Sequence, residues 1–253
     1  MKKGISVVVL TRNEEVNIEA CLKSCSFADQ LIVVDDGSTD RTIEIAESLG
    51  AKVFHRALDG DWGAQKSFGI AQATEHWVYL IDADERVTPD LAKKLLECAA
   101  GEDKACWVQR HNRFRHIRAE HGTMRPDWVC RLVPKAHVRV IGQVHEEVRC
   151  DCPPVRIHGD GMIHYPYRTW RQYFNKFNAY TELSAEKYLA QGKRVGFWEH
   201  IVLKPIWAFI KIYFVSGGFL DGKAGFIFAA NHYFYTMTKY VRYYFLKNYS
   251  GEL

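Results

Sequence analysis

The first hundred residues alternate short apolar runs with amphipathic segments. Residues 5–10, 31–34 and 78–81 are continuous apolar runs of strand length, rich in β-branched side chains. Residues 18–25 and 42–49 place apolar side chains three and four positions apart, which predicts helices. Strands that are apolar along their whole length are typical of a parallel sheet covered by helices on both faces. The pattern therefore predicts an α/β domain.

Polar side chains follow each of the three predicted strands directly. Thr11 follows the first, Asp35 and Asp36 follow the second, and Asp82 and Asp84 follow the third. Open α/β sheets bind ligands beyond the carboxyl ends of their strands, so we expect these groups to gather at one edge. Carboxylates spaced i, i+2 lie on the same side of an extended chain, and their hard oxygens suit Mg²⁺ or Mn²⁺. The alternative for such an Asp-x-Asp (DxD) motif is a solvated turn after a buried strand.

The C-terminal third is rich in aromatic side chains punctuated by single lysines. Its longest uncharged run, residues 224–238, has 15 residues and is shorter than the roughly 20 that a bilayer-spanning helix needs. Apolar and aromatic bodies with spaced cations instead favour helices that lie in a membrane interface. The alternative is that these aromatic side chains pack on the first domain or form a dimer contact. We predict no transmembrane segment.

Charge and cysteine content refine this picture. Residues 1–100 carry 11 Lys and Arg and 17 Asp and Glu, a net charge of −6. The whole chain has 34 Lys and Arg and 30 Asp and Glu, so residues 101–253 carry 23 basic and 13 acidic residues, a net charge of +10. The acidic part needs a cation to hold an anionic nucleotide, and the basic part is expected to face an anionic partner, such as a phosphorylated acceptor or a membrane surface. Seven cysteines, an odd number without matched metal-binding pairs, favour reduced thiols in the cytosol.

Seven short motifs are spread along the chain. In chain order they are residues 8–15 (VVLTRNEE), 32–40 (IVVDDGSTD), 62–66 (WGAQK), 80–85 (LIDADE), 131–135 (RLVPK), 142–146 (GQVHE) and 218–222 (GFLDG). By these motifs and their order the chain resembles the family 2 inverting glycosyltransferases over nearly its whole length. More narrowly, it resembles the bacterial β-1,4-glucosyltransferases that build the lipopolysaccharide core.

The resemblance implies a GT-A type fold, which is Rossmann-like with a mostly parallel central sheet flanked by helices. Residues 1–168 would form the nucleotide-sugar-binding and catalytic domain, with acceptor-side elements at about residues 105–168. Residues 169–253 would form a helical appendage that associates with the membrane.

The resemblance also implies roles for the polar residues. Uridine contacts are expected from Thr11, Asn13 or Glu14, and the pair Asp35 and Asp36, with Asp35 the stronger candidate of the pair because relatives often have Asp-Ser here. Asp84 would bind Mg²⁺ or Mn²⁺ directly, and Asp82 would contact the ribose or a metal-bound water. His164 would be a further metal or diphosphate contact. The metal would offset charge on the departing diphosphate.

Two cationic side chains are candidates for the phosphates. Lys66 is expected to reach the diphosphate or the base, and its alternative is a surface lysine. Arg131 is a candidate clamp for the diphosphate or an acceptor phosphate, because a guanidinium binds such oxygens bidentately.

An inverting transfer is a single displacement that needs a general base outside the metal cluster. We expect Glu146 to be this base, with His145 orienting it or contacting a phosphate. Asp127 is the alternative base. Alternation along a strand would leave Glu147 in solvent.

The expected function is transfer of a hexose, with glucose the first choice, from a UDP-sugar to a lipid-linked saccharide such as inner-core heptose. The enzyme would act at the inner face of the bacterial cytoplasmic membrane, as a peripheral protein with an anionic lipid surface as partner. No nucleic-acid role is expected, because the sugar-nucleotide motifs account for the chemistry. The sequence leaves the oligomeric state open. Alternatives are a glycosyltransferase of another envelope or capsular glycan, a sugar-nucleotide nucleotidyltransferase, or a non-catalytic membrane module.

Overall fold

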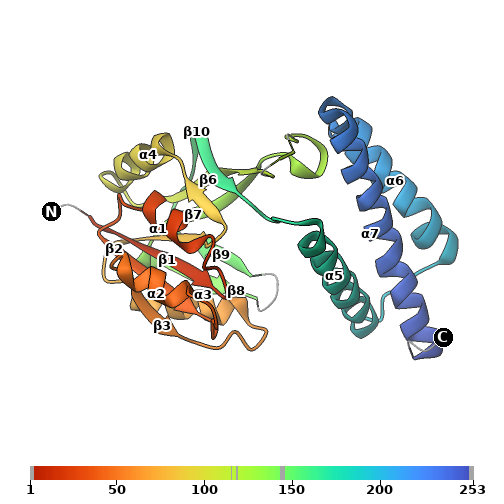
Figure 1. Ribbon diagram of the computed structural model, residues 1–253, viewed down its shortest axis with the longest axis horizontal. Helices are drawn as coiled ribbons and strands as arrows, with labels where there is room; N and C mark the ends of the chain where they lie inside the picture. Colours follow the sequence, from red (N-terminus) through yellow and green to blue (C-terminus); the bar gives the residue numbers. More distant parts are fainter. Residues whose placement is uncertain (1–2, 115, 118, 143–145, 251–253) are drawn as a thin grey trace. The chain divides into compact units, whose positions relative to one another are not determined.

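The structure, a computed structural model, describes residues 3–114, 116–117, 119–142 and 146–250. The chain divides into two compact units (Figure 1). The first, here called the sheet unit, comprises Met1–His111 and Asp127–His164, and the second, the helical unit, comprises Asn112–Pro126 and Tyr165–Leu253.

An eight-stranded sheet forms the centre of the sheet unit, in the order β3-β2-β1-β4-β7-β6-β10-β5 among the described residues. A separate ribbon pairs β8 with β9 antiparallel. The strands are β1 (Ile5–Thr11), β2 (Gln30–Asp35), β3 (Lys52–His55), β4 (Trp77–Asp82), β5 (Glu85–Val87), β6 (Ala105–Asn112), β7 (Asp127–Pro134), β8 (Val138–Ile141), β9 (Glu147–Cys150) and β10 (Pro154–His164).

The four strands β3, β2, β1 and β4 are parallel to one another. Thr11 lies opposite Asp35 in the register of β1 and β2, and Leu10 lies opposite Asp82 in the register of β1 and β4. The three strands predicted from the apolar runs are thus confirmed, and their polar ends meet at one edge of the sheet. Beyond β4 the pairs β4–β7, β6–β7 and β10–β5 are antiparallel.

Side chains of the parallel strands point alternately into two separate apolar cores. Val7, Val33 and Tyr79 belong to one core, whereas Val8 and Leu80 belong to the other. Helices α1 (Ile18–Ser24), α2 (Thr42–Ser48) and α4 (Pro89–Ala99) contribute to the first core, and α3 (Trp62–Gln72) contributes to the second. Each such fully buried aliphatic side chain stabilises the fold by roughly 1.5–3 kcal/mol. Burial on both faces is the reason for the continuous apolar strands.

One detail of the predicted strand ends is wrong. β4 ends at Asp82, Ala83 and Asp84 form a turn, and the chain becomes extended again only at Glu85. The alternation argument that placed Asp82 and Asp84 on the same side of a strand therefore does not apply. The turn instead directs each carboxylate to its own set of neighbours.

The helical unit contains two long helices and a broken helical hairpin. In Figure 1, α5 (Trp170–Ala190) runs beside α7 (Gly222–Tyr249), and the two are in contact. Between them come the π-helical turns η3 (Phe197–Leu203) and η4 (Lys211–Val215), which flank α6 (Lys204–Ile210), and the 3₁₀ turn η5 (Gly218–Asp221). Two further 3₁₀ turns are η1 (Gly122–Met124) and η2 (Lys135–His137).

Residues 112–126 pack with these helices, although we expected them in the first domain. The Asp221 carboxylate accepts hydrogen bonds from the backbone N–H groups of Glu120 and His121 and contacts His121 Nδ1 at 2.8 Å. The buried side chains of Ala119 and Met124 pack with Phe228 of α7. These contacts tie the loop to the helical unit, and the functional division of the chain near residue 168 stays a prediction.

Within the described ranges, no single helix is both long and apolar enough to cross a bilayer. A pair of helical segments, Phe197–Val215 and Gly218–Tyr249, meets the length and hydropathy of a span only when taken together, and it is bent by 70°.

Candidate active site at the carboxyl edge of the sheet

The buried end of β1 offers an unused hydrogen-bonding group. Thr11 is 6% exposed, and its Oγ1 has no hydrogen-bond partner within the part of the chain that the structure describes. Buried hydroxyl groups are normally paired, because an unpaired one loses its hydration without compensation. The Thr11 hydroxyl therefore has the capacity to bind a ligand at this edge.

The two carboxylates at the end of β2 brace the neighbouring loops. Asp35 is fully buried and accepts hydrogen bonds from the Ser38 hydroxyl and from the Ser38 backbone N–H at 2.9 Å. Asp36 accepts from the Leu58 backbone N–H at 2.7 Å and from Arg12 Nη1 at 3.0 Å. A carboxylate has about four lone-pair sites, so each retains capacity for one more donor.

Asn13 and Glu14 join the loops after β1 and β2. Asn13 has a left-handed backbone (φ 53°), and its side-chain oxygen accepts from the Thr39 backbone N–H at 2.8 Å. The Glu14 carboxylate accepts from the Asn17 side-chain amide at 2.6 Å. Both side chains thus hold the loops at this edge of the sheet, which is compatible with a contact to a nucleotide but does not require one.

A guanidinium and two carboxylates form the centre of the site. Arg131 of β7 donates to both carboxylate oxygens of Glu85, one at 2.7 Å, and to Asp82 Oδ2 at 3.1 Å. Glu85 also accepts from the Asp82 backbone N–H at 3.0 Å. Because β7 pairs with β4 and Glu85 begins β5, three strands contribute to this cluster.

The pKa values of the two carboxylates in this cluster, Glu85 and Asp82, are shifted in opposite directions. Burial raises the pKa of Glu85 despite the neighbouring Arg131. Burial also opposes ionisation of Asp82, but the positive charges of Arg131 and Lys66 outweigh it and hold the pKa of Asp82 below its usual range. Burial opposes the charge on Arg131 too, yet Glu85 and Asp82 raise the pKa of its guanidinium. Arg131 Nε is buried without a partner among the described residues, so this guanidinium still has a donor to offer.

Asp84 pairs with a different strand. Its Oδ2 lies 3.4 Å from His164 Nε2 at the end of β10, where His164 faces Glu85 in the register with β5. Two ligands at right angles on Mg²⁺, each at about 2.1 Å, lie about 3 Å apart, so this oxygen and nitrogen fit one divalent cation. No group of three or more His, Cys, Asp and Glu side chains within the described ranges is arranged to hold a metal ion. A cation here would therefore take its remaining ligands from a bound phosphate and water.

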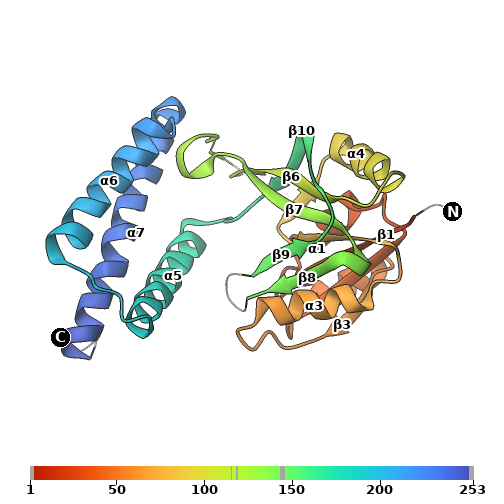
Figure 2. The same ribbon diagram turned by 180° about the vertical axis from the view of Figure 1, so that it is seen from behind.

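Lys66 and Glu146 meet across 80 positions of the chain. Lys66 Nζ donates to Glu146 Oε1 at 2.7 Å, and both side chains are mostly buried. The approach depends on Gly63 near the start of α3, because a Cβ there would come within 2.1 Å of the Gly142 carbonyl oxygen. In Figure 2, α3 lies beside β8, the strand that leads to Gly142. Lys66 is consequently not a surface lysine.

The remaining candidates have different surroundings. Asp127 is held by Arg110 through two hydrogen bonds, Nε to Oδ1 at 3.0 Å and Nη2 to Oδ2 at 2.7 Å. Glu147 is exposed and pairs with Arg149, so the expectation that it faces solvent is confirmed. His145 lies outside the described residues.

Sequence reasoning gave no role to Glu85 and Arg110. Glu85 is fully buried between Arg131 and Arg110, with Arg110 Nη1 at 3.4 Å, although it follows the Asp-x-Asp motif in what reads as a polar turn. Of the residues Glu85, Arg86 and Val87, only Val87 favours a strand, so the sequence carries little signal that Glu85 begins one.

The chain was compared with known proteins. Residues 6–157 match the family described as Glycosyl transferase family 2. The chain is 28% identical over 234 residues to the lipopolysaccharide core biosynthesis glycosyltransferase LpsC of Rhizobium meliloti, covering 89% of this chain and 86% of that protein. It is also 28% identical over 250 residues to an uncharacterized glycosyltransferase of Rickettsia typhi, covering 89% and 81%.

A solved structure is also similar in part. Glucosyl-3-phosphoglycerate synthase from Mycobacterium tuberculosis, in complex with Mn²⁺, UDP and phosphoglyceric acid, matches with 26% identity and a TM-score of 0.34, over 45% of this chain and 44% of that one. Together with the family match, the sheet and its flanking helices confirm the expected GT-A type fold.

Proposed function

The chain belongs to glycosyl transferase family 2 and is a glycosyltransferase, and from that premise we propose that it transfers a hexose from a UDP-sugar to a lipid-linked saccharide with inversion. The observation that carries the proposal is the convergence of Thr11, Asp35 and Asp82 in neighbouring register positions of three parallel strands. An open α/β sheet binds its ligand at such an edge.

The uridine would lie over the ends of β1 and β2. Its uracil N–H would donate to Asp35 or Asp36, and the unpartnered Thr11 hydroxyl would complete the contact. The hydrogen bonds of Asn13 and Asp36 to the adjoining loops hold this surface in place before the nucleotide arrives. Preorganised contacts of this kind improve affinity because little ordering remains to be done on binding.

The diphosphate would lie over the turn after β4. Asp84 and His164 would hold Mg²⁺ or Mn²⁺, and Asp82, already held by Arg131, would contact the ribose or a metal-bound water. When bound, the ion would act as a Lewis acid that offsets charge on the departing UDP. The remaining Arg131 donor and Lys66 would add positive charge on the same side.

Glu146 would be the general base for the acceptor hydroxyl. In the structure it is paired with Lys66, so it becomes available only when that ammonium moves to another anion. The donor diphosphate is such an anion. We infer that donor binding draws Lys66 away and frees Glu146, so that the base becomes competent only once the donor is in place.

Asp127 is a weaker candidate for the base. Both of its oxygens are occupied by Arg110, whose charge also lies near Glu85. A carboxylate held bidentately by a guanidinium has to break two charge-assisted hydrogen bonds before it accepts a proton.

One relative supports the proposed acceptor. LpsC is named for lipopolysaccharide core biosynthesis, which supports a saccharide of the bacterial envelope, with inner-core heptose the first choice. We propose glucose as the hexose that the donor carries. The enzyme would act at the inner face of the cytoplasmic membrane.

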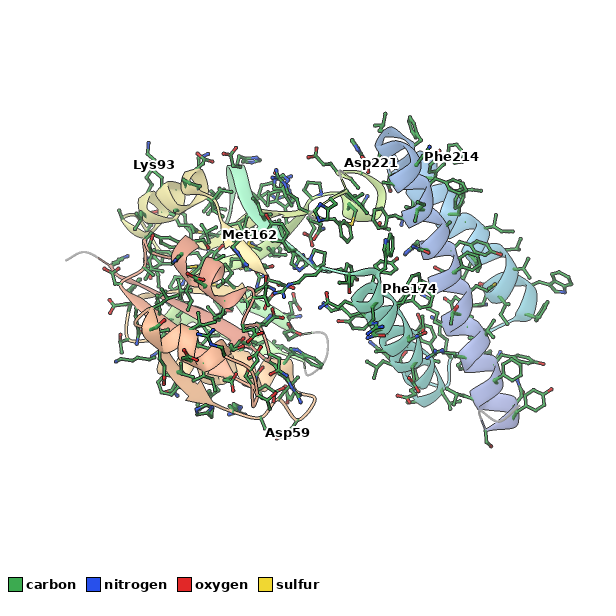
Figure 3. All side chains as sticks on the ribbon, in the orientation of Figure 1. Asp59, Lys93, Met162, Phe174, Phe214 and Asp221 are labelled. Carbon is green, nitrogen blue, oxygen red and sulfur yellow. The ribbon has the colours of Figure 1, made fainter. Side chains whose placement is uncertain are left out.

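A membrane surface is the proposed partner of the helical unit. Phe214, labelled in Figure 3, is 58% exposed, and Trp198 is 72% exposed. Further large apolar side chains exposed in the same stretch are Phe197, Leu203, Ile206, Trp207, Val215, Phe219, Leu220, Phe226 and Ile227. Lysines at 204, 211 and 223 lie among them in the sequence, and such a mixture of apolar and cationic side chains suits an anionic lipid interface.

The function is tested by incubating the protein with radiolabelled UDP-glucose, Mg²⁺ or Mn²⁺, and heptose-containing lipid acceptor. We expect metal-dependent transfer, or slow hydrolysis of the donor without acceptor. A panel of other UDP-sugars, scored by stabilisation against thermal unfolding, identifies the preferred donor. Absence of transfer and hydrolysis together with undetectable UDP binding would refute the proposal.

A further inference from the structure

Four basic side chains surround a pair of stacked tyrosines in the helical unit. Tyr188 of α5 and Tyr240 of α7 stack with ring centroids 5.7 Å apart and planes inclined by 17°. We call the group the tyrosine–lysine cluster, and its members are Tyr188, Lys193, His200, Lys204, Lys239 and Tyr240.

The basic groups reach the tyrosines from separate parts of the unit. Lys193, in the loop after α5, places Nζ 4.0 Å from the centre of the Tyr188 ring. Lys204 and Lys239 place theirs 5.8 Å and 5.2 Å from the centre of the Tyr240 ring. The His200 ring lies edge-on to Tyr240, with centroids 5.1 Å apart. The loop, α6 and α7 therefore bring three positive charges to one place, and η3 adds an imidazole.

Within the residues that the structure describes, a single carboxylate forms ion pairs with this cluster. Glu199 contacts Lys204 at 3.0 Å and lies 3.6 Å from His200, but its side chain is 66% exposed. Three effects lower the pKa of the Lys239 ammonium, namely burial and the positive charges of Lys193 and Lys204. Burial and Lys204 likewise lower the pKa of His200. Cation–π attraction holds each lysine near a ring but leaves the repulsion between the lysines in place.

Half-buried cations that repel one another are stabilised when an anion enters between them. The ammonium groups supply several donors, and an ammonium binds phosphate as a compact point charge. A phosphate carries more charge and more acceptor oxygens than a carboxylate, which matches three lysines better. Leu203 directly precedes Lys204 and Trp207 follows it by three residues, and they are 60% and 59% exposed, so apolar surface adjoins the cluster.

We propose that the tyrosine–lysine cluster is a binding site for a phosphate group. Two sources carry that chemistry, the headgroup of an anionic phospholipid and a soluble phosphate. None of its residues is among those to which the proposed glycosyl transfer assigns donor binding or proton transfer.

The test compares Lys239→Met with Lys247→Met in the whole chain. Both remove one positive charge from α7, but Lys247 is exposed and lies outside the cluster. Thermal unfolding is followed in inorganic phosphate and in chloride at equal ionic strength. We expect phosphate to stabilise the wild type and Lys247→Met, and to have little effect on Lys239→Met. Lys193→Met, in a loop, gives a second cluster variant that does not depend on helix packing.

Vesicle binding distinguishes the two sources. Vesicles of phosphatidylcholine with phosphatidylglycerol are compared with vesicles of phosphatidylcholine alone. If a lipid headgroup is the source, Lys239→Met weakens binding to the anionic vesicles by about fivefold more than Lys247→Met. If soluble phosphate is the source, phosphate distinguishes the variants and vesicles do not. Equal behaviour of Lys239→Met, Lys193→Met and Lys247→Met in both assays would overturn the proposal.

Discussion

Lys66 Nζ and Glu146 Oε1 form an ion pair of 2.7 Å that joins α3 to the segment before β9. The pair brings together a cation suited to the donor diphosphate and the carboxylate proposed as the base. Most of both side chains is shielded from water, so the pair is screened less than one on the surface. Any ligand that takes Lys66 also releases Glu146.

Replacing the proposed base tests this relationship directly. Glu146→Gln keeps the size of the side chain and is expected to retain UDP-sugar binding while lowering turnover about 10²–10⁴-fold, as for a lost general base. Initial rates and donor affinity are measured in parallel. Glu147→Gln is the matched control, because Glu147 is the next residue and is exposed. Near-normal turnover of Glu146→Gln would contradict the assignment of Glu146 as the general base and leave Asp127 as the candidate.

Asp84 is expected to be required for metal-dependent nucleotide binding. In Asp84→Ala the cation loses its carboxylate ligand, so titration calorimetry is expected to show no enhancement of UDP binding by Mn²⁺ or Mg²⁺. Asp151→Ala, which removes an exposed carboxylate paired with Arg139, is the control. An unchanged UDP affinity of Asp84→Ala in the presence of metal would show that Asp84 does not bind the ion.

Glu85 is expected to matter for stability as well as for the site. Glu85→Gln removes one of the two carboxylates that Arg131 contacts, so we expect it to cost at most the roughly 3–5 kcal/mol of the free energy of unfolding that breaking a buried ion pair costs. The double variant Glu85→Gln/Arg131→Met removes both charges and is expected to recover part of that loss. Urea unfolding of the two variants measures the difference. A single variant as stable as the wild type would show that the ion pair contributes little.

The exposed aromatic side chains of the helical unit are expected to bind lipid. Trp198→Ser/Trp207→Ser removes two of the large exposed side chains and is expected to lower binding to anionic vesicles at least tenfold, since burial of one such side chain contributes about 1.5–3 kcal/mol. Leu96→Ser, an exposed apolar position on α4, is the control. UDP binding should stay unchanged in both. Vesicle binding that is equally strong in the double variant would argue that these tryptophans do not enter the interface.

The helices and strands around the carboxyl edge of the sheet were predictable because local patterns specify them. A continuous apolar run such as residues 31–34 has to be buried on both faces, and helices with one apolar side cover it. Gly217 lies between η4 and η5 and has a left-handed backbone (φ 72°), a conformation that favours glycine. The position of Asp84 was not predictable in the same way, because a tight turn after β4 replaces the extended chain that strand alternation assumes.

The sequence by itself determined the family, the parallel strands and which residue types end them, because these follow from local apolar patterning and short motifs. Only the tertiary structure decided the partners of those residues: Arg131 with Glu85 and Asp82, Arg110 with Asp127, and Lys66 with Glu146. The physical reason is that each ion pair forms between side chains on different elements, brought together by strand pairing and helix packing. A charged residue is read from the sequence as solvated until its partner is known, and burial with that partner sets its charge state and its availability to a ligand.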